Sequence, residues 1–180
     1  MPVNKLHGFT LIEVIFGIVL MSIVLTIVTG LLAPQARQSA DPIIQVKANE
    51  IGQAMMNEIL GRSFDENSRR SPPFIRCGET GFSGCTTPAN LGDDGETRAG
   101  YDDVDDFIGN YATADLQNSL GQNLQNDYLG FSLSVNVVYD DDVNGVADTT
   151  GNFNRLKLVT IEVTAPTGDV YGFAAYKGNY

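Results

Sequence analysis

The residues with the clearest spacing for chemistry lie in a short acidic stretch, DDDVNGVAD, at positions 140–148. This stretch fits D-x-D-x-N-G-x-x-D, the start of a calcium-binding loop, in which alternate oxygens converge and glycine permits a sharp turn. The candidate calcium ligands are Asp140, Asp142, Asn144, Val146 and Asp148. The twelfth position holds Gly151 instead of the bidentate glutamate of an EF-hand, so an acidic hairpin turn around Asn144-Gly145 is the alternative.

A second acidic run, YDDVDDF, occupies positions 101–107. Its candidate cation ligands are Asp102, Asp103, Asp105 and Asp106. Such a run is more often the start of a helix or a solvated face, and a contact with a neighbouring subunit is a further alternative. An ion at both acidic runs is not expected.

The chain has few residues that could carry out acid–base or nucleophilic catalysis. The only histidine is His7, there are two cysteines, and no nucleophile motif is present, so we expect no enzyme. The formal net charge is −11, from 11 basic and 22 acidic residues, which argues against nucleic acid as a partner because phosphate binding needs a basic face.

Cys77 and Cys85 lie close together in a stretch rich in glycine, proline and threonine. The positive-inside tendency places Lys5 in the cytoplasm and the bulk of the chain across a membrane, in an oxidising space. A disulfide closing a small loop is therefore expected. The alternatives are a metal site, which lacks further ligands, and a pair of reduced thiols.

Glu13 is an ionisable residue at the start of a segment that is otherwise apolar. No residue from 14 to 33 is charged, and 20 helical residues span about 30 Å, the thickness of a hydrocarbon core. The apolar run is longer than that of a secretory signal and no A-x-A-like cleavage site follows it. An ordinary membrane anchor leaves Glu13 unexplained, since a charge in a membrane helix is costly without a partner.

Cleavage between Gly8 and Phe9 would supply that partner. The new amine of Phe9 on one subunit could meet the carboxylate of Glu13 on a neighbour when such helices pack with an axial stagger. Glu13 would then set the register of an assembly.

The elements that position these residues follow from periodicity. Pro34 is expected to kink or loosen the apolar helix. Residues 41–61 form a second helix with one apolar face, which is expected to be covered by the sheet of the head and not to form a ligand groove. That face consists of Ile44, Ala48, Ile51, Met55 and Ile59.

The rest of the chain divides into a loop-rich part and a sheet. Residues 62–126 are rich in turn formers, whereas 131–139, 155–166 and 169–179 read as three antiparallel strands, the last two joined at Thr167-Gly168. The fold class is α+β, a long helix packed on a small antiparallel sheet. The predicted divisions are a leader (1–8), a membrane or fibre-core helix (9–33), its amphipathic continuation (34–61), a loop-rich region (62–126) and the sheet (127–180).

The stretch GFTLIEVIFGIVLMSIV resembles the class III signal of type IV prepilins: a leader ending in glycine, then phenylalanine, glutamate at the fifth mature position, and an apolar helix. The resemblance implies the type IV pilin fold, cleavage after Gly8 by a prepilin peptidase, and N-methylation of Phe9. It also implies an inner-membrane precursor with a cytoplasmic N-terminus and periplasmic head. Assembly machinery in that membrane would then extrude a surface fibre of a Gram-negative bacterium. The leader carries a single lysine, a modest departure.

Further blocks narrow the resemblance. SADPIIQVKANEIGQAMMNEILGRSFDENS, ETRAGYDDVDDFIGNY and AYKGNY resemble the minor pilin D group of the mannose-sensitive haemagglutinin (MSHA) pilus. This implies a minor subunit, at low copy or starting or capping the fibre, with other pilins as partners and surface attachment as the role. The alternatives are a pseudopilin of a type II secretion system and a plain membrane-anchored domain that binds calcium or adheres.

Overall fold

The computed structural model describes residues 9–38, 41–117, 122–151 and 153–180. Within it, the chain forms two compact units: one ends at Ile44, and the other, called the head below, is Gln45–Tyr180. Each unit is described by itself. The predicted leader, including Gly8, lies outside the described residues.

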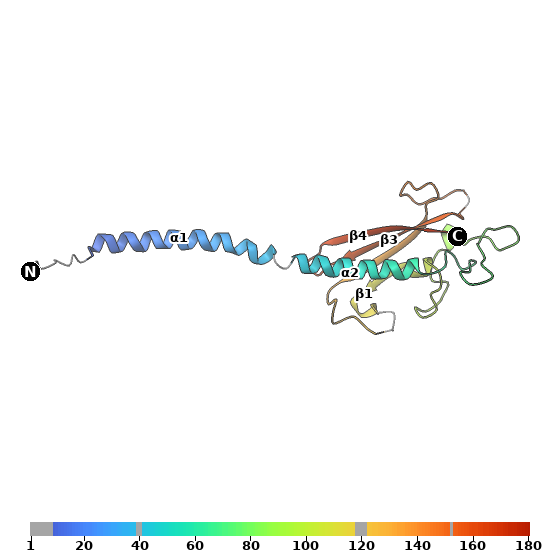
Figure 1. The fold of residues 1–180 in the computed structure, drawn as a ribbon, viewed down its shortest axis with the longest axis horizontal. Helices are drawn as coiled ribbons and strands as arrows, with labels where there is room; N and C mark the ends of the chain where they lie inside the picture. The colour runs from blue at the N-terminus through green and yellow to red at the C-terminus, as the bar shows by residue number, and fades with distance from the viewer. Residues whose placement is uncertain (1–8, 39–40, 118–121, 152) are drawn as a thin grey trace, which may run out of the picture. The chain divides into compact units, whose positions relative to one another are not determined.

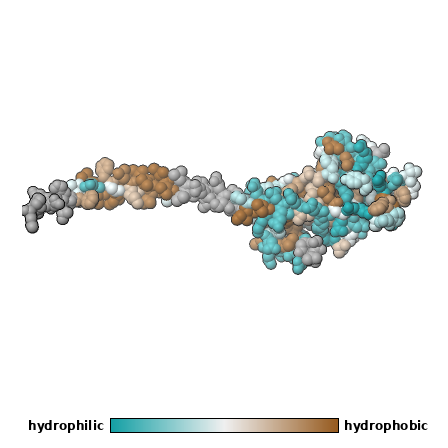
Figure 2. Space-filling model, viewed as in Figure 1, coloured by the Kyte–Doolittle hydropathy of each residue, from teal (hydrophilic) through white to brown (hydrophobic). Residues whose placement is uncertain are grey.

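The first helix, α1 (Leu11–Gln38), carries the apolar segment (Figure 1). Its part Leu11–Gly30 has a mean hydropathy of 2.8 and is long and apolar enough to cross a membrane. Its apolar side chains face outward and colour this part brown in Figure 2. The hydroxyls of Ser22, Thr26 and Thr29 each donate to a carbonyl four residues earlier, at 2.8–2.9 Å. These bonds satisfy polar groups that lipid could not.

Helix α1 continues past Pro34, so the predicted boundary between residues 33 and 34 falls inside it. The second helix, α2, is Asp41–Leu60, with residues 39 and 40 between the two. A proline removes one backbone hydrogen bond, but the glutamine, alanine and arginine that follow Pro34 have adequate helix propensity. Pro34 therefore does not end the helix.

The predicted apolar face of α2 lies in the core of the head. Ala48, Ile51, Met55 and Ile59 are buried, and Ile44, at the end of the first unit, is half-buried. Gly52 on α2 packs against the ring of Phe173, where even a Cβ atom would collide with that ring. The methionine-containing stripe is thus part of the core, as expected, and glycine lets the helix approach the sheet closely.

The sheet is a four-stranded antiparallel meander of β1 (Gly109–Ala112), β2 (Ser132–Tyr139), β3 (Leu156–Thr164) and β4 (Val170–Gly178), in the order β1-β2-β3-β4. The predicted α+β class and its three C-terminal strands are confirmed. Along residues 131–139, which were predicted as a strand, the odd-numbered side chains are buried. Gly168, with φ +90°, lies in the predicted turn between β3 and β4.

The loop-rich region contains more structure than expected. It supplies the short edge strand β1 and three 3-10 turns, η1 (Pro88–Asn90), η2 (Asp105–Phe107) and η3 (Thr113–Asp115). A small second core forms here as well: Phe64, Cys77 and Tyr139 are buried together, with Cys85, Leu91 and Phe153 packed against them. This second core fixes the loops against β2.

Candidate functional site

The residues at the N-terminal end of α1 are exposed. Phe9 is 83% exposed, and Glu13 lies in the first turn, where its backbone N–H donates to the carbonyl of Thr10 at 3.1 Å. Within the described residues, no group donates a hydrogen bond to the Glu13 carboxylate. The pairing of Glu13 with the amine of a neighbouring Phe9 stays a prediction, and this geometry leaves the carboxylate free for it.

The acidic run at 102–106 is largely buried. Asp103, Asp105 and Asp106 are each 1% exposed, and only Asp102 faces solvent. The interpretation of this run as a solvated face is therefore wrong for three of its four aspartates. The run passes into η2, so its carboxylates lie beside their own backbone N–H groups.

Two of these carboxylates organise the turn. Oδ2 of Asp106 accepts the backbone N–H groups of Asp102 and Asp103, at 2.8 and 2.9 Å. Oδ1 of Asp103 accepts the N–H of Asp105 at 2.8 Å. Hydrogen bonds of this kind offset part of the cost of burying a carboxylate.

The cation at this site belongs to the chain itself. Lys157, on β3, is fully buried, and its Nζ lies 2.5 Å from Oδ1 of Asp105 and 3.3 Å from Oδ2 of Asp65. Nζ also donates to the carbonyl oxygen of Phe64 at 2.7 Å. We call Lys157, Asp65, Asp103 and Asp105 the Lys157 cluster. Of the four aspartates that the sequence suggested as cation ligands, Asp105 pairs with this ammonium group.

Asp65 is the best-satisfied acid of the Lys157 cluster. Its carboxylate accepts the N–H groups of Asn67 (3.1 Å) and Thr86 (2.9 Å). It also accepts the hydroxyl of Tyr139 at 3.3 Å. Burial and the negative charge of Asp65 raise the pKa of Tyr139, so this phenol stays protonated as a donor.

Asp103 is the least-satisfied acid. Burial, followed by the nearby negative charge of Asp105, raises the pKa of Asp103 from 3.8 to about 8. Its Oδ2 and the Oδ2 of Asp105 are buried and receive no N–H or hydroxyl hydrogen bond within the described residues. A proton on Asp103 that is shared with Asp105 accounts for both atoms, because a protonated carboxyl can donate.

The role of Lys157 was missed from sequence, although a signal was present. Lys157 is in phase with Val159, Ile161 and Val163, which are buried on one face of β3. A lysine at the inward position of an alternating strand must be neutralised inside the core. No comparable pattern indicates Asp65, which lies in an irregular segment.

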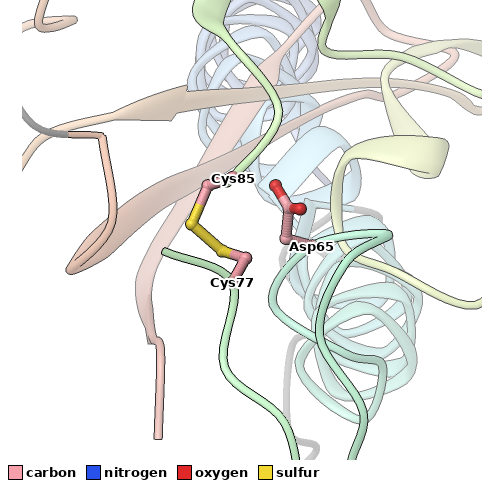
Figure 3. Close-up of side chains that lie close together, drawn as sticks. All are labelled: Asp65, Cys77 and Cys85. Carbon is pink, nitrogen blue, oxygen red and sulfur yellow. A yellow bond between two sulfur atoms is a disulfide. The ribbon is translucent and has the colours of Figure 1, made fainter. Parts of the chain in front are cut away.

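Cys77 and Cys85 form a disulfide, and Figure 3 shows Asp65 beside it. A carboxylate oxygen and the two sulfur atoms lie within 4.8 Å of one another. Because the sulfurs are bonded to each other, neither is a thiolate ligand, and Asp65 is already engaged by Lys157. The Nδ2 group of Asn179 donates to the carbonyl of Cys77 at 3.1 Å and to that of Asn154 at 2.9 Å, which holds the disulfide loop in place.

The acidic loop at 140–148 is folded around one buried carboxylate. Asp140 is fully buried; its Oδ1 accepts the N–H of Asn144 at 2.9 Å and its Oδ2 that of Gly145 at 2.8 Å. The hydroxyl of Tyr176, on β4, donates to the same Oδ2 at 2.5 Å. The hydrogen bond from Tyr176, with those from the loop, holds the pKa of Asp140 below its usual range.

The other predicted calcium ligands lie around this loop. Oxygen atoms of Asp140, Asp142 and Asp148 lie within 4.8 Å of one another, and the side chain of Val146 is exposed. Asn144 Oδ1 accepts the N–H of Val146 at 2.7 Å. The oxygens are gathered as the spacing predicts, but Asp140 is engaged by donors from the protein. Calcium binding therefore stays a prediction.

The comparisons with known proteins concern the N-terminal segment alone. Residues 4–29 match the family model of the prokaryotic N-terminal methylation motif. No curated protein and no solved structure matches the chain. The chain thus carries a type IV pilin-like class III signal, followed by an apolar helix and an α+β head. This motif implies processing by a prepilin peptidase, single-pass anchoring through α1, and assembly into pilus-type fibres.

Proposed function

We propose that this protein is a minor subunit of a type IV pilus of the MSHA type, which starts, caps or enters the fibre and contributes to surface attachment. The observation that carries the proposal is the methylation motif at residues 4–29 continuing directly into an exposed apolar helix. That helix leaves the lipid for the fibre core, and the head stays outside. The sequence blocks that resemble the MSHA minor pilin D group favour the pilus and the minor role.

A pseudopilin of a type II secretion system is the second candidate. It would share the processed N-terminus and a head made of helix and sheet, but would build a short periplasmic fibre instead of a surface pilus. The methylation motif supports both candidates equally. The location of the mature chain separates them.

The experiment is mass spectrometry of the chain in fibres sheared from the cell surface and in the membrane fraction. The pilus proposal predicts a chain that begins at N-methylated Phe9 in the sheared fibres. A processed chain confined to the membrane and periplasm would favour the pseudopilin. A chain that keeps residues 1–8 in every fraction would overturn both candidates.

Glu13→Ala tests the mechanism of assembly. We expect cleavage after Gly8 to continue and entry into fibres to fall at least tenfold, because the amine of Phe9 would lose its partner in an apolar core. The matched control is Glu79→Ala, which removes an exposed carboxylate in the head. Unchanged fibre entry of Glu13→Ala would show that Glu13 has no role in register.

A further inference from the structure

We propose that Lys157 and Asp105 condense into an intramolecular amide bond that joins strand β3 to the turn η2, with Asp65 and Asp103 carrying the protons. The inference is independent of the fibre role, because it rests only on the interior of the head. It assigns a covalent modification to the Lys157 cluster, in which one lysine is buried with three aspartates.

The reacting groups are already in contact. Nζ of Lys157 lies 2.5 Å from Oδ1 of Asp105, and the side chains are 0% and 1% exposed. Groups held this close and this rigidly can react with effective concentrations far above those of free molecules in solution. The two residues are 52 positions apart, so only the folded head brings them together.

The surroundings exclude water from the amine. Nζ lies 4.8 Å from the ring centroid of Phe64 and 5.2 Å from that of Tyr139. The same rings shield the amide product from hydrolysis.

Asp103 supplies the acid for the reaction. It is 1% exposed, and its Oδ2 receives no N–H or hydroxyl hydrogen bond within the described residues. Its side chain hydrogen bonds that of Asp105, whose Oδ2 receives no N–H or hydroxyl hydrogen bond within the described residues. A proton donated to Asp105 makes its carboxyl carbon electrophilic, as in acid-assisted acyl transfer.

Asp65 is placed to accept the proton that the lysine must lose. Its Oδ2 lies 3.3 Å from Nζ. After the reaction, the carboxylate of Asp65 still accepts the N–H groups of Asn67 and Thr86 and the hydroxyl of Tyr139. It therefore does not depend on the ammonium for all of its hydrogen bonds.

The step balances without any co-reactant. The ammonium of Lys157 transfers one proton to Asp65, and the free amine attacks Cγ of Asp105 to form the C–N bond. Asp103 donates its proton to an oxygen of the tetrahedral intermediate and then takes up the second surplus proton of the nitrogen. The proton held by Asp65 passes to the same oxygen, which can then leave as water. The C–O bond breaks and one water leaves, so that the ammonium and carboxylate become an amide and water, while Asp65 and Asp103 return to their starting forms.

The test is intact mass spectrometry of the chain purified from membranes in detergent with its disulfide intact. We expect nearly all molecules to be lighter than the sequence mass, corrected for processing and the disulfide, by one water molecule. Trypsin gives a second readout: cleavage after Lys157 is blocked, and the peptide 99–155 is recovered linked to 156–177. A folded parent protein of uncondensed mass, with free peptide 158–177 after digestion, would overturn the proposal without any variant.

Two substitutions define the chemistry. Lys157→Arg keeps the cation but cannot form this amide, so its mass should show no loss of water. Lys177→Arg is the matched control, because Lys177 donates to the carbonyls of Leu60 and Arg62 and should leave the cross-link intact. Asp103→Asn should retain the fold and lower the cross-linked fraction at least tenfold in freshly made protein; full cross-linking in this variant would remove Asp103 from the mechanism.

Discussion

The two aspartate-rich runs of the head, 102–106 and 140–148, have similar composition and very different surroundings. The first is buried around the ammonium of Lys157, which comes from a distant strand. The second is neutral in its partners: its buried Asp140 accepts two N–H groups of its own loop and the hydroxyl of Tyr176 from β4. The contrast teaches that the side chain supplied by the sheet, a lysine on β3 or a tyrosine on β4, determines the environment of an aspartate cluster more than its local sequence does.

The pKa shifts in the two runs also have opposite signs. Burial raises the pKa of Asp103 to about 8, whereas hydrogen bonds lower the pKa of Asp140. One region therefore favours a bound proton and the other favours its loss. Stability measurements on matched variants can separate them.

The largest expected effect comes from Lys157→Met. Removing Lys157 takes away both its ion pairs and the proposed amide and leaves Asp65 and Asp105 without their shared partner, and we expect a loss of at least about 3–5 kcal/mol in the free energy of unfolding. Urea unfolding of the detergent-solubilised chain measures this. The control Arg155→Met, at an exposed neighbouring position, should change stability by less than about 0.5 kcal/mol. Equal effects of the two substitutions would mean that the cluster contributes nothing specific.

The next effect is a pH dependence that originates at Asp103. Its pKa is about 8 in the folded head and near 3.8 when unfolded, so between these values the folded state binds the extra proton. Stability should therefore fall as pH rises through this window, by up to about 1.4 kcal/mol per pH unit. Asp103→Asn should flatten the slope in urea titrations at a series of pH values. A slope that persists in this variant would have to arise elsewhere.

The acidic loop should respond with the opposite sign and more weakly. The pKa of Asp140 is lowered in the folded state, so its stabilising contribution is present above about 3.8 and is lost as pH falls below that value. Tyr176→Phe removes the first cause of the lowered pKa and should reduce this loss on the acid side. The urea midpoint, compared at mildly and strongly acidic pH, measures this loss. If Tyr176→Phe loses as much stability as the parent at acidic pH, the hydrogen bond from Tyr176 to Asp140 is not the cause of the loss.

The smallest effect is expected for Asp142→Ala in the absence of calcium. The side chain lies in an exposed part of the loop, and we expect less than about 0.5 kcal/mol. Any rise in Tm that millimolar calcium gives the parent should vanish in this variant. No rise in the parent would remove the calcium prediction, and the same rise in both proteins would exclude Asp142 as a ligand.

The periodicity of apolar residues was sufficient to predict the regular elements of this fold from the sequence. The stripe from Ala48 to Ile59 has enough repeats to predict the buried face of α2. The runs 131–139, 155–166 and 169–179 were long enough to predict β2, β3 and β4. β1 has only four residues in a turn-rich stretch, too few to establish a period. The Lys157 cluster was beyond sequence reasoning because it joins three segments that are far apart in the chain, although the inward phase of Lys157 was a usable signal.

The meander order of the sheet has a consequence for how the head folds. Neighbouring strands of the sheet are also neighbours in the chain, so each pairing closes only the connection between two consecutive strands, the longest of which is 113–131. The Lys157 cluster instead joins residues up to 92 positions apart, so we expect it to form after the strands have paired. Its completion would mark a head that has finished folding before it reaches the fibre, and the proposed amide would make that final step irreversible.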